Sequence, residues 1–430
     1  MNKFINLTLN DKSMKIPFHL KAIKHRIIDI IQRDKDEVAI LKTENHLSEY
    51  WVNQNLLIHP WETHWFQLRD NTLFKLKRNL LVEIISKGIK KAGNTNRFCK
   101  KLNLGVSTVY NLINGRGISM ISVRKLRRIL TYMNIPYVSF NSKIEYTKKG
   151  KIISIMNPKF PINLNNPDGA WLLGCIVSDG CIYLDKSSRH VFRTKYASGD
   201  QESIDLFHLT INRVFGKTHV HTELERNCTV LRIGSSIIGE ALLKIGAILG
   251  HKASVNEDLP WMVKSGDLNL KKSYLRAVFS DEGSLYCGPT KNSNYITLSR
   301  YSHIKNISQR QKQFLKALIP NMKSKRFPTG HETKRITIKS ALGLEPELRP
   351  LIEINLPKLL LDERKMLSEF GIDSRFWKQS LNLTHLGKWS ICCDVIINKK
   401  KSILQFARMI GFNIRKKKAK LNKIVKKLKN

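Results

Sequence analysis

Apolar residues gather into two short runs that end in the same way. Residues 171–180 read WLLGCIVSDG, and residues 274–283 read YLRAVFSDEG. Each run has the length and apolar character of a buried helix, and each stops at an acidic residue followed by glycine. Small residues also recur at matching positions, which lets two helix backbones pack closely. The aligned pairs are Gly174 with Ala277, Asp179 with Glu282, and Gly180 with Gly283.

The acid at the end of each run predicts a metal site. If the two helices pack together, Asp179 and Glu282 bring two negative charges to one place. Like charges repel strongly at short range in apolar surroundings, so a cation is needed between them. Mg²⁺ prefers a few carboxylate oxygens together with water and phosphate. We therefore expect both acids to bind Mg²⁺ and to act in phosphodiester hydrolysis, where the ion activates water and stabilises the leaving oxygen.

The segments after the two runs repeat as well. Each run is followed by a basic strand, a polar turn and an amphipathic helix, and each half closes with a strand, a helix, an "IG" step and a lysine. Short apolar runs that alternate with charged turns indicate an α+β fold. The expected strands are 192–198, 218–224, 229–234, 294–300 and 334–339. The closing lysines are Lys252 and Lys417.

This double pattern resembles the LAGLIDADG (DOD-type) homing endonucleases in their single-chain form, over residues 166–430. The first copy departs from the family motif at Val177, whereas the acid is kept in both copies. The resemblance implies a pseudo-twofold pair of αββαββα repeats with antiparallel saddle sheets, in a monomer that cuts both strands of a long DNA site. It also implies that Lys252 and Lys417 assist catalysis. Sheet residues would then contact double-stranded DNA, with Arg193, Lys195, Arg300, Lys334 and Arg335 as candidates.

A helix-turn-helix is predicted upstream, over residues 95–115. Phe98, Leu104, Val109 and Leu112 supply buried positions, and Asn103 falls where the turn needs a left-handed backbone. The stretch resembles the phage-repressor type of this motif. Its exposed face would reach base edges and phosphates in the major groove. The candidate DNA contacts are Ser107, Thr108, Tyr110 and Asn111.

These features divide the chain into five expected parts. Residues 1–90 are expected to be mostly helical, with no assigned role, and residues 91–140 to form an all-α helix-turn-helix domain. The proline- and asparagine-rich stretch 141–165 is expected to be a linker. The two endonuclease repeats then occupy 166–267 and 268–430, and the second ends in a lysine-rich helix.

Charge narrows the choice of partner. The 430 residues include 75 lysines and arginines against 34 acidic residues, a formal charge of +41. Such a charge indicates a polyanionic partner, and nucleic acid is favoured over an anionic membrane surface. No apolar run approaches the ~20 residues that span a bilayer, and the N-terminal stretch lacks a signal-peptide core. Seven scattered cysteines without metal-site spacing indicate reduced thiols, so we expect an intracellular protein of the cytoplasm, the nucleoid or an organelle.

Two other functions fit the same features. One is a transcription regulator that keeps this fold but does not cut, although regulators of that kind have usually lost the acids. The other is a maturase that binds intron RNA, because shape-based RNA contacts use the same basic surface.

Overall fold

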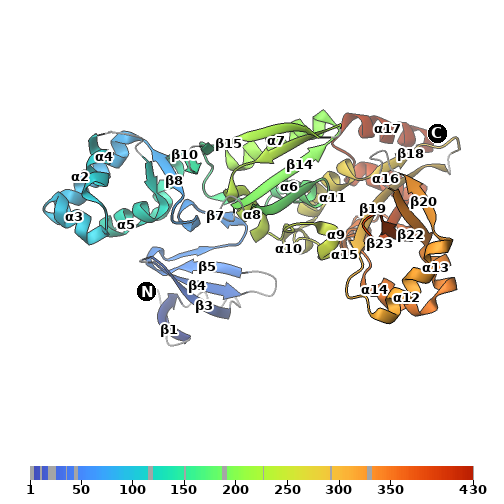
Figure 1. Cartoon of the computed structure of the whole chain (residues 1–430). Helices are drawn as coiled ribbons and strands as arrows, with labels where there is room; N and C mark the ends of the chain where they lie inside the picture. Colours follow the sequence, from blue (N-terminus) through green and yellow to red (C-terminus); the bar gives the residue numbers. More distant parts are fainter. Residues whose placement is uncertain are drawn as a thin grey trace. The chain divides into compact units, whose positions relative to one another are not determined.

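The computed structural model describes residues 4–9, 12–17, 26–34, 36–42, 47–114, 120–149, 152–185, 191–225, 227–290, 293–326 and 332–429. The chain forms two compact units. The first contains residues 1–165, 209–221 and 233–245, and the second contains residues 166–208, 222–232 and 246–430. Both units combine helices with antiparallel sheets, as the α+β expectation requires (Figure 1).

The expectation of a mostly helical region over residues 1–90 is wrong. Among the described residues the first α-helix is α2, Arg78–Ala92, and strands precede it. Val38, Ala39 and Leu41 of β4 are all buried, so both faces of this strand pack against other parts of the protein. The elements are β1 (Phe4–Leu9), β2 (Lys12–Pro17), β3 (Arg26–Arg33), β4 (Asp36–Lys42), β5 (Leu47–Trp51), η1 (Val52–Gln54), β6 (Leu56–Ile58), β7 (Glu62–Thr63), η2 (Trp65–Gln67) and β8 (Leu73–Leu76).

The predicted helix-turn-helix lies within a bundle of four helices. After α2 come α3 (Thr95–Leu102), α4 (Val106–Asn114) and α5 (Val123–Met133), with β9 (Met120–Ser122) before α5. Asn103 ends α3 with φ 51° and ψ 54°, so the predicted left-handed turn is confirmed. The four expected core residues are also buried. The bundle begins at residue 78 rather than 91, and because β8 pairs with β9 and β10, this part of the chain is not all-α.

The stretch 141–165 is not a simple linker. It contains the end of η3 (Tyr137–Lys143), then β10 (Ile144–Lys149), β11 (Ile152–Met156) and β12 (Ile162–Asn163). β10 and β11 are central strands of a five-stranded sheet in the order β15-β11-β10-β8-β9, where β15 is Lys217–Thr218. Pro158 and Pro161, which suggested a linker, lie beyond β11.

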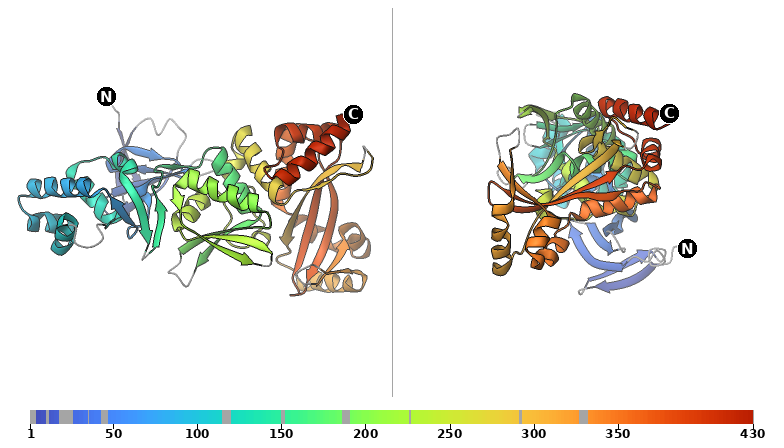
Figure 2. Two further views of the ribbon diagram at one scale, coloured as in Figure 1. Left: turned by 90° about the horizontal axis from the view of Figure 1, so that it is seen from above. Right: turned by 90° about the vertical axis from the view of Figure 1, so that its right-hand side faces the viewer.

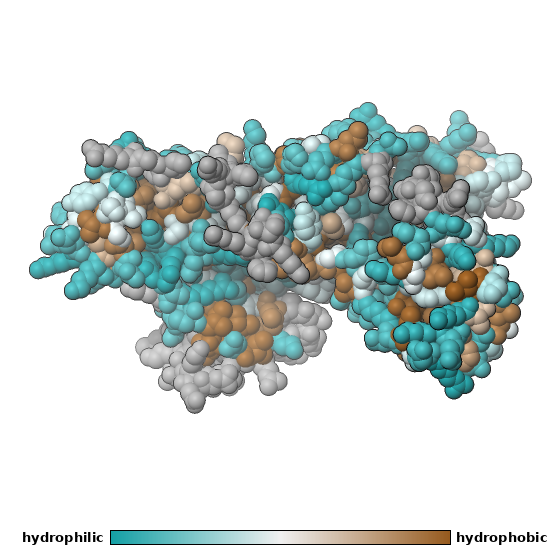
Figure 3. All heavy atoms as spheres, in the orientation of Figure 1, coloured by the Kyte–Doolittle hydropathy of each residue, from teal (hydrophilic) through white to brown (hydrophobic). Residues whose placement is uncertain are grey.

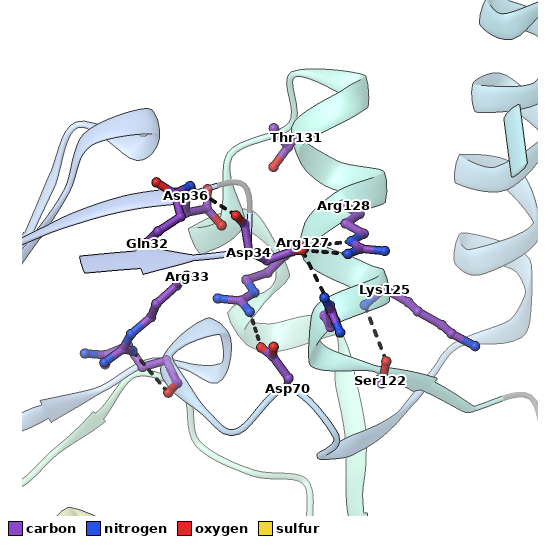
Figure 4. A network of polar contacts seen from close by, with 12 residues as sticks. Gln32, Arg33, Asp34, Asp36, Asp70, Ser122, Lys125, Arg127, Arg128 and Thr131 are labelled. Atoms are coloured by element: carbon purple, nitrogen blue, oxygen red, sulfur yellow. Dashed lines mark hydrogen bonds and ion pairs between the residues drawn. The ribbon is translucent and has the colours of Figure 1, made fainter. Parts of the chain in front are cut away.

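Ion pairs join the β3–β4 hairpin to α5 within the first unit (Figure 4). Asp34 accepts hydrogen bonds from Arg128 Nε at 2.7 Å and Nη2 at 2.6 Å. The same guanidinium donates to the carbonyl of Leu102 at 3.1 Å, directly before the turn of the helix-turn-helix. Asp36 accepts from Tyr137 Oη at 2.9 Å. These contacts hold the turn between α3 and α4 against the β3–β4 hairpin.

The first repeat follows the expected element order. It contains α6 (Pro167–Val177), β13 (Gly180–Asp185), β14 (Val191–Ser198), α7 (Gln201–Phe215), β16 (Val220–Glu225), β17 (Cys228–Ile233) and α8 (Ser236–Lys244). The sheet order is β13-β14-β17-β16. α6 begins where Asn166 caps the amide of Gly169 and Pro167 occupies the first turn, two features that favour a helix start.

The second repeat contains an insertion. Its sheet order is β18-β19-β23-β22-β21-β20, and the first four strands reproduce the order of the first sheet. The segment from α12 to α15 adds the β20–β21 hairpin and further helices, which the simple αββαββα expectation lacked (Figures 1 and 2). The five expected strand positions agree with β14, β16, β17, β19 and β21. Two short helices, α9 (Lys252–Val255) and α10 (Trp261–Lys264), precede the second repeat. The elements of the second repeat are α11 (Leu268–Asp281), β18 (Ser284–Tyr286), β19 (Tyr295–His303), α12 (Gln309–Ala317), η5 (Ile319–Asn321), β20 (Lys323–Arg326), β21 (Glu332–Thr337), α13 (Ile338–Leu344), η6 (Pro346–Leu348), α14 (Arg349–Ile354), α15 (Lys358–Glu369), β22 (Arg375–Thr384), β23 (Trp389–Ile397), α16 (Lys400–Met409) and α17 (Arg415–Lys429).

Candidate metal and nucleic-acid site

The two motif helices, α6 and α11, pack directly against each other in the second unit (Figure 1). A Cβ atom added to Gly174 would lie 2.6 Å from Ala277 Cβ and 2.7 Å from the carbonyl oxygen of Tyr274. Both distances are well below van der Waals contact, so the close approach requires glycine at this position. Gly180 and Gly283 are similarly crowded by the backbone of their own helices, at 2.8 Å and 2.5 Å.

The two predicted acids come together at the ends of these helices. Asp179 follows Ser178, the C-cap of α6, and Glu282 is the C-cap of α11. The pKa of Asp179 is raised to about 6, first by burial of the carboxyl among protein atoms and then by the negative charge of Glu282. Part of Asp179 still reaches solvent. The contact between α6 and α11, called the helix seam below, therefore places two interacting carboxyls at an accessible point.

Asp281 is a third carboxyl that the sequence analysis did not single out. It lies opposite Ser178 in the alignment, and Ser178 Oγ donates a hydrogen bond to it. Tyr196 Oη donates a second one at 2.8 Å. Burial and the charge of Asp179 raise the pKa of Asp281 to about 7. Two consecutive acids in the sequence SDEG were the signal that could have identified it.

The two closing lysines occupy matching places. Lys252 Nζ donates to the carbonyl of Ser178 and lies 3.4 Å from that of Ile176, both in the last turn of α6. Lys417 Nζ donates to the carbonyls of Ser280 at 2.5 Å and Asp281 at 3.1 Å, in the last turn of α11. Burial lowers the pKa of both ammonium groups, against the raising effect of the nearby acids. Each lysine is thus anchored beside one acid of the pair.

Arg300 is not part of the exposed surface, so its assignment as a DNA contact is corrected. It is 5% exposed and forms an ion pair with Glu282. Its Nε and Nη2 atoms donate to both oxygens of Glu363, at 3.0 Å and 2.6 Å. Glu363 is fully buried and also accepts from Tyr274 Oη at 3.1 Å. The arginine points inward because residues on one strand alternate between the two faces of the sheet.

The other predicted sheet residues lie partly exposed on strands. Arg193 and Lys195 share one face of β14, where they pair with Asp185 at 3.3 Å and Glu225 at 2.9 Å. On β21, Lys334 is partly exposed and Arg335 Nε donates to Ser380 Oγ at 2.7 Å. Arg335 also lines a hollow of about 500 Å³ on the second sheet. Its other lining residues are His251, Ala253, Tyr301, His303, Thr333, Asn382, Thr384 and Ser390.

The residues of α4 that were predicted to contact DNA are exposed or partly exposed. Ser107, Tyr110 and Asn111 lie at the surface of α4, and Thr108 is partly exposed. Tyr110 is 51% exposed. Hydrophilic residues cover much of the surface around α3 in the same bundle (Figure 3).

Two features are absent from the described residues. No three His, Cys, Asp or Glu side chains there are grouped so that they could hold a metal ion. None of the described helices is both long and apolar enough to cross a bilayer.

Comparisons with known proteins gave only weak structural similarity. No family model and no curated protein matches the chain. Among solved structures, variants of the homing endonuclease I-DmoI align with a TM-score of 0.30 and 11% identity, over 60% of this chain and 98% of theirs. I-DmoI in complex with DNA and Ca aligns with a TM-score of 0.31 and 11% identity, over 60% and 98%. Full-length DUF199/WhiA from Thermatoga maritima aligns with a TM-score of 0.29 and 15% identity, over 61% and 60%. Similarity at this level carries no functional inference.

Proposed function

We propose that this chain is a metal-dependent, site-specific endonuclease of double-stranded DNA. The observation that supports this most is the pair of acids, Asp179 and Glu282, at the foot of one tightly packed helix seam, with a lysine anchored beside each. Both acids belong to one chain, so a monomer contains the complete pair. The second unit alone supplies all four residues.

Asp179 fits a divalent cation such as Mg²⁺. Its carboxyl is partly open to solvent, and its raised pKa reflects an electrostatic cost that a nearby cation would relieve. Asp281 adds a second carboxyl within electrostatic range. A bound ion would polarise the phosphodiester and lower the pKa of an attacking water.

The lysines would act on the phosphate. Each ammonium group is fixed by carbonyl oxygens of the helix end, so its position does not depend on a flexible side chain alone. A fixed positive charge beside the scissile phosphate stabilises the charge that develops in the transition state. Lys252 would serve one half of the site and Lys417 the other.

DNA binding would combine two surfaces. The formal charge of +41 provides the general attraction to phosphates. Arg193, Lys195, Lys334 and Arg335 on the sheets would contact backbone and bases. Ser107, Thr108, Tyr110 and Asn111 on α4 would supply additional contacts in a major groove.

A DNA-binding regulator that does not cut is the second candidate. The observation in its favour is the ion pair between Arg300 and Glu282, because an acid that is already neutralised is less available to a metal ion. The exposed helix-turn-helix face serves a regulator equally well.

Cleavage of a randomised duplex library in the presence of Mg²⁺ separates these functions. The endonuclease hypothesis predicts enrichment of one cut sequence, and Asp179→Asn should abolish cutting while the protein still binds the selected duplex. Asp205→Asn, an exposed acid on α7, is the matched control and should cut normally. Sequence-specific binding without any cut product would instead identify a regulator.

A further inference from the structure

The two acids of the seam have different surroundings. Within the described residues, the Asp179 carboxylate takes part in no ion pair, whereas Glu282 is paired with Arg300. Because both acids end equivalent helices, this difference comes from residues outside the motifs. In a site with twofold symmetry both acids would have the same charged neighbours, whereas here only Glu282 has an arginine partner.

A buried network holds Arg300 in place. Its guanidinium makes two hydrogen bonds to Glu363, which is completely buried and is held in turn by Tyr274 Oη. The arginine cannot move away from Glu282 without leaving Glu363 as an unpaired buried charge, which is strongly unfavourable in a low-dielectric interior. The third set of donors, at Nη1, faces Glu282. The positive charge beside this acid is therefore a permanent part of the fold.

The first half has no counterpart of this arginine. Gly180 pairs with Tyr196 on the neighbouring strand, and Ser284 pairs with Thr297, which sets Gly283 opposite Leu298. Two residues further along each strand, the first half has Ser198 and the second has Arg300. Ser198 accepts a hydrogen bond from the amide of Asp200 at 3.1 Å and brings no charge. The two halves therefore differ in charge at equivalent strand positions, with serine in the first half and arginine in the second.

We propose that Arg300 takes the place of a divalent cation at Glu282, so that the chain binds a single such ion, at Asp179. The guanidinium pairs directly with Glu282, whereas Asp179 lies near the ammonium groups of Lys252 and Lys417 without an ion pair to either, and there the metal ion would supply the direct contact. This deepens the proposed function and rests on it in one consequence: the two DNA strands are cut at unequal rates, so nicked duplex accumulates before linear product. The ion count itself does not depend on cleavage.

Counting bound Mn²⁺ on the full chain tests the proposal. Electron paramagnetic resonance of free Mn²⁺ during a titration gives the number of ions bound per chain. We expect one ion for the wild type, none for Asp179→Asn, and still one for Glu282→Gln. The double variant Arg300→Met/Glu363→Gln removes both buried charges while Gln can still accept from Tyr274, and it should bind a second ion.

Several results would overturn the proposal. A wild type that binds two ions, or none, contradicts it, as does loss of the single ion in Glu282→Gln. A double variant that is folded by circular dichroism but still binds one ion shows that Arg300 does not exclude the second. If the double variant does not fold, the numbers of Mn²⁺ ions bound by Asp179→Asn and by Glu282→Gln are sufficient to test the proposal. Cleavage is measured separately on nicked and linear products, so an ion count of one without any cutting would refute the endonuclease and leave the count intact.

Discussion

Substitution of Gly174 by alanine tests the packing on which the site depends. The added Cβ would lie 2.6 Å from Ala277 Cβ and 2.7 Å from the Tyr274 carbonyl oxygen. The second neighbour is backbone, which cannot rotate away, so α6 and α11 must separate. The substitution should therefore weaken the fold and displace the acids at the helix ends.

The change in the free energy of unfolding caused by Gly174→Ala follows from two opposing effects. Overpacking of a well-filled core typically costs about 1–3 kcal/mol, and two contacts below 3 Å place this site in the upper part of that range. Replacing glycine by alanine in a helix gains about 1 kcal/mol. We expect a net loss of roughly 1–2 kcal/mol in the free energy of unfolding.

Gly343 offers a matched control. It lies in α13, and a Cβ there would meet nothing within 4 Å. Gly343→Ala should leave stability unchanged or raise it by about 0.5–1 kcal/mol. Urea unfolding of both variants, with the midpoint and slope compared, gives the difference. If Gly174→Ala proves as stable as Gly343→Ala, α6 and α11 do not pack as closely as described, and the argument that their packing brings Asp179 and Glu282 together loses its basis.

Three further predictions concern pH, the turn and the recognition helix. The pKa of Asp281 rises from 3.8 to about 7 on folding, so the free energy of unfolding should fall as pH rises from about 4 to 8. Asp281→Asn should remove ~1–2 kcal/mol of that fall after allowance for partial exposure of the carboxyl. Thermal unfolding of both proteins at pH 5 and 8 with EDTA measures the difference, and equal pH profiles would contradict the prediction. Asn103→Ala should cost about 1–2 kcal/mol in chemical denaturation because of the positive φ, whereas Asn103→Gly should cost nothing. Tyr110→Ala should weaken duplex binding about tenfold with stability unchanged, in contrast to the exposed control Val138→Ala, and equal affinities of the two variants would argue against α4 as a DNA contact.

Local patterns in the sequence were sufficient to predict several helices and strands. The helices α3 and α4 and the turn between them were predictable because their buried positions and the left-handed Asn103 lie within about twenty residues, and short-range spacing determines them. The two motif helices and the closing lysines were recognisable because the chain repeats, so each copy supports the other. The N-terminal strands escaped detection because their apolar runs are short, and runs of that length suit a helix or a strand equally.

The amino-acid sequence by itself determined the repeated motifs, the paired acids, the basic charge and the left-handed turn at Asn103. Only the tertiary structure decided that Asp281 joins the cluster, that Arg300 turns inward to Glu282 and Glu363, and that an insertion extends the second sheet. The physical reason is distance along the chain. Arg300 and Glu363 are 63 residues apart, and whether a charged side chain is buried depends on such a remote partner, which no local pattern reports.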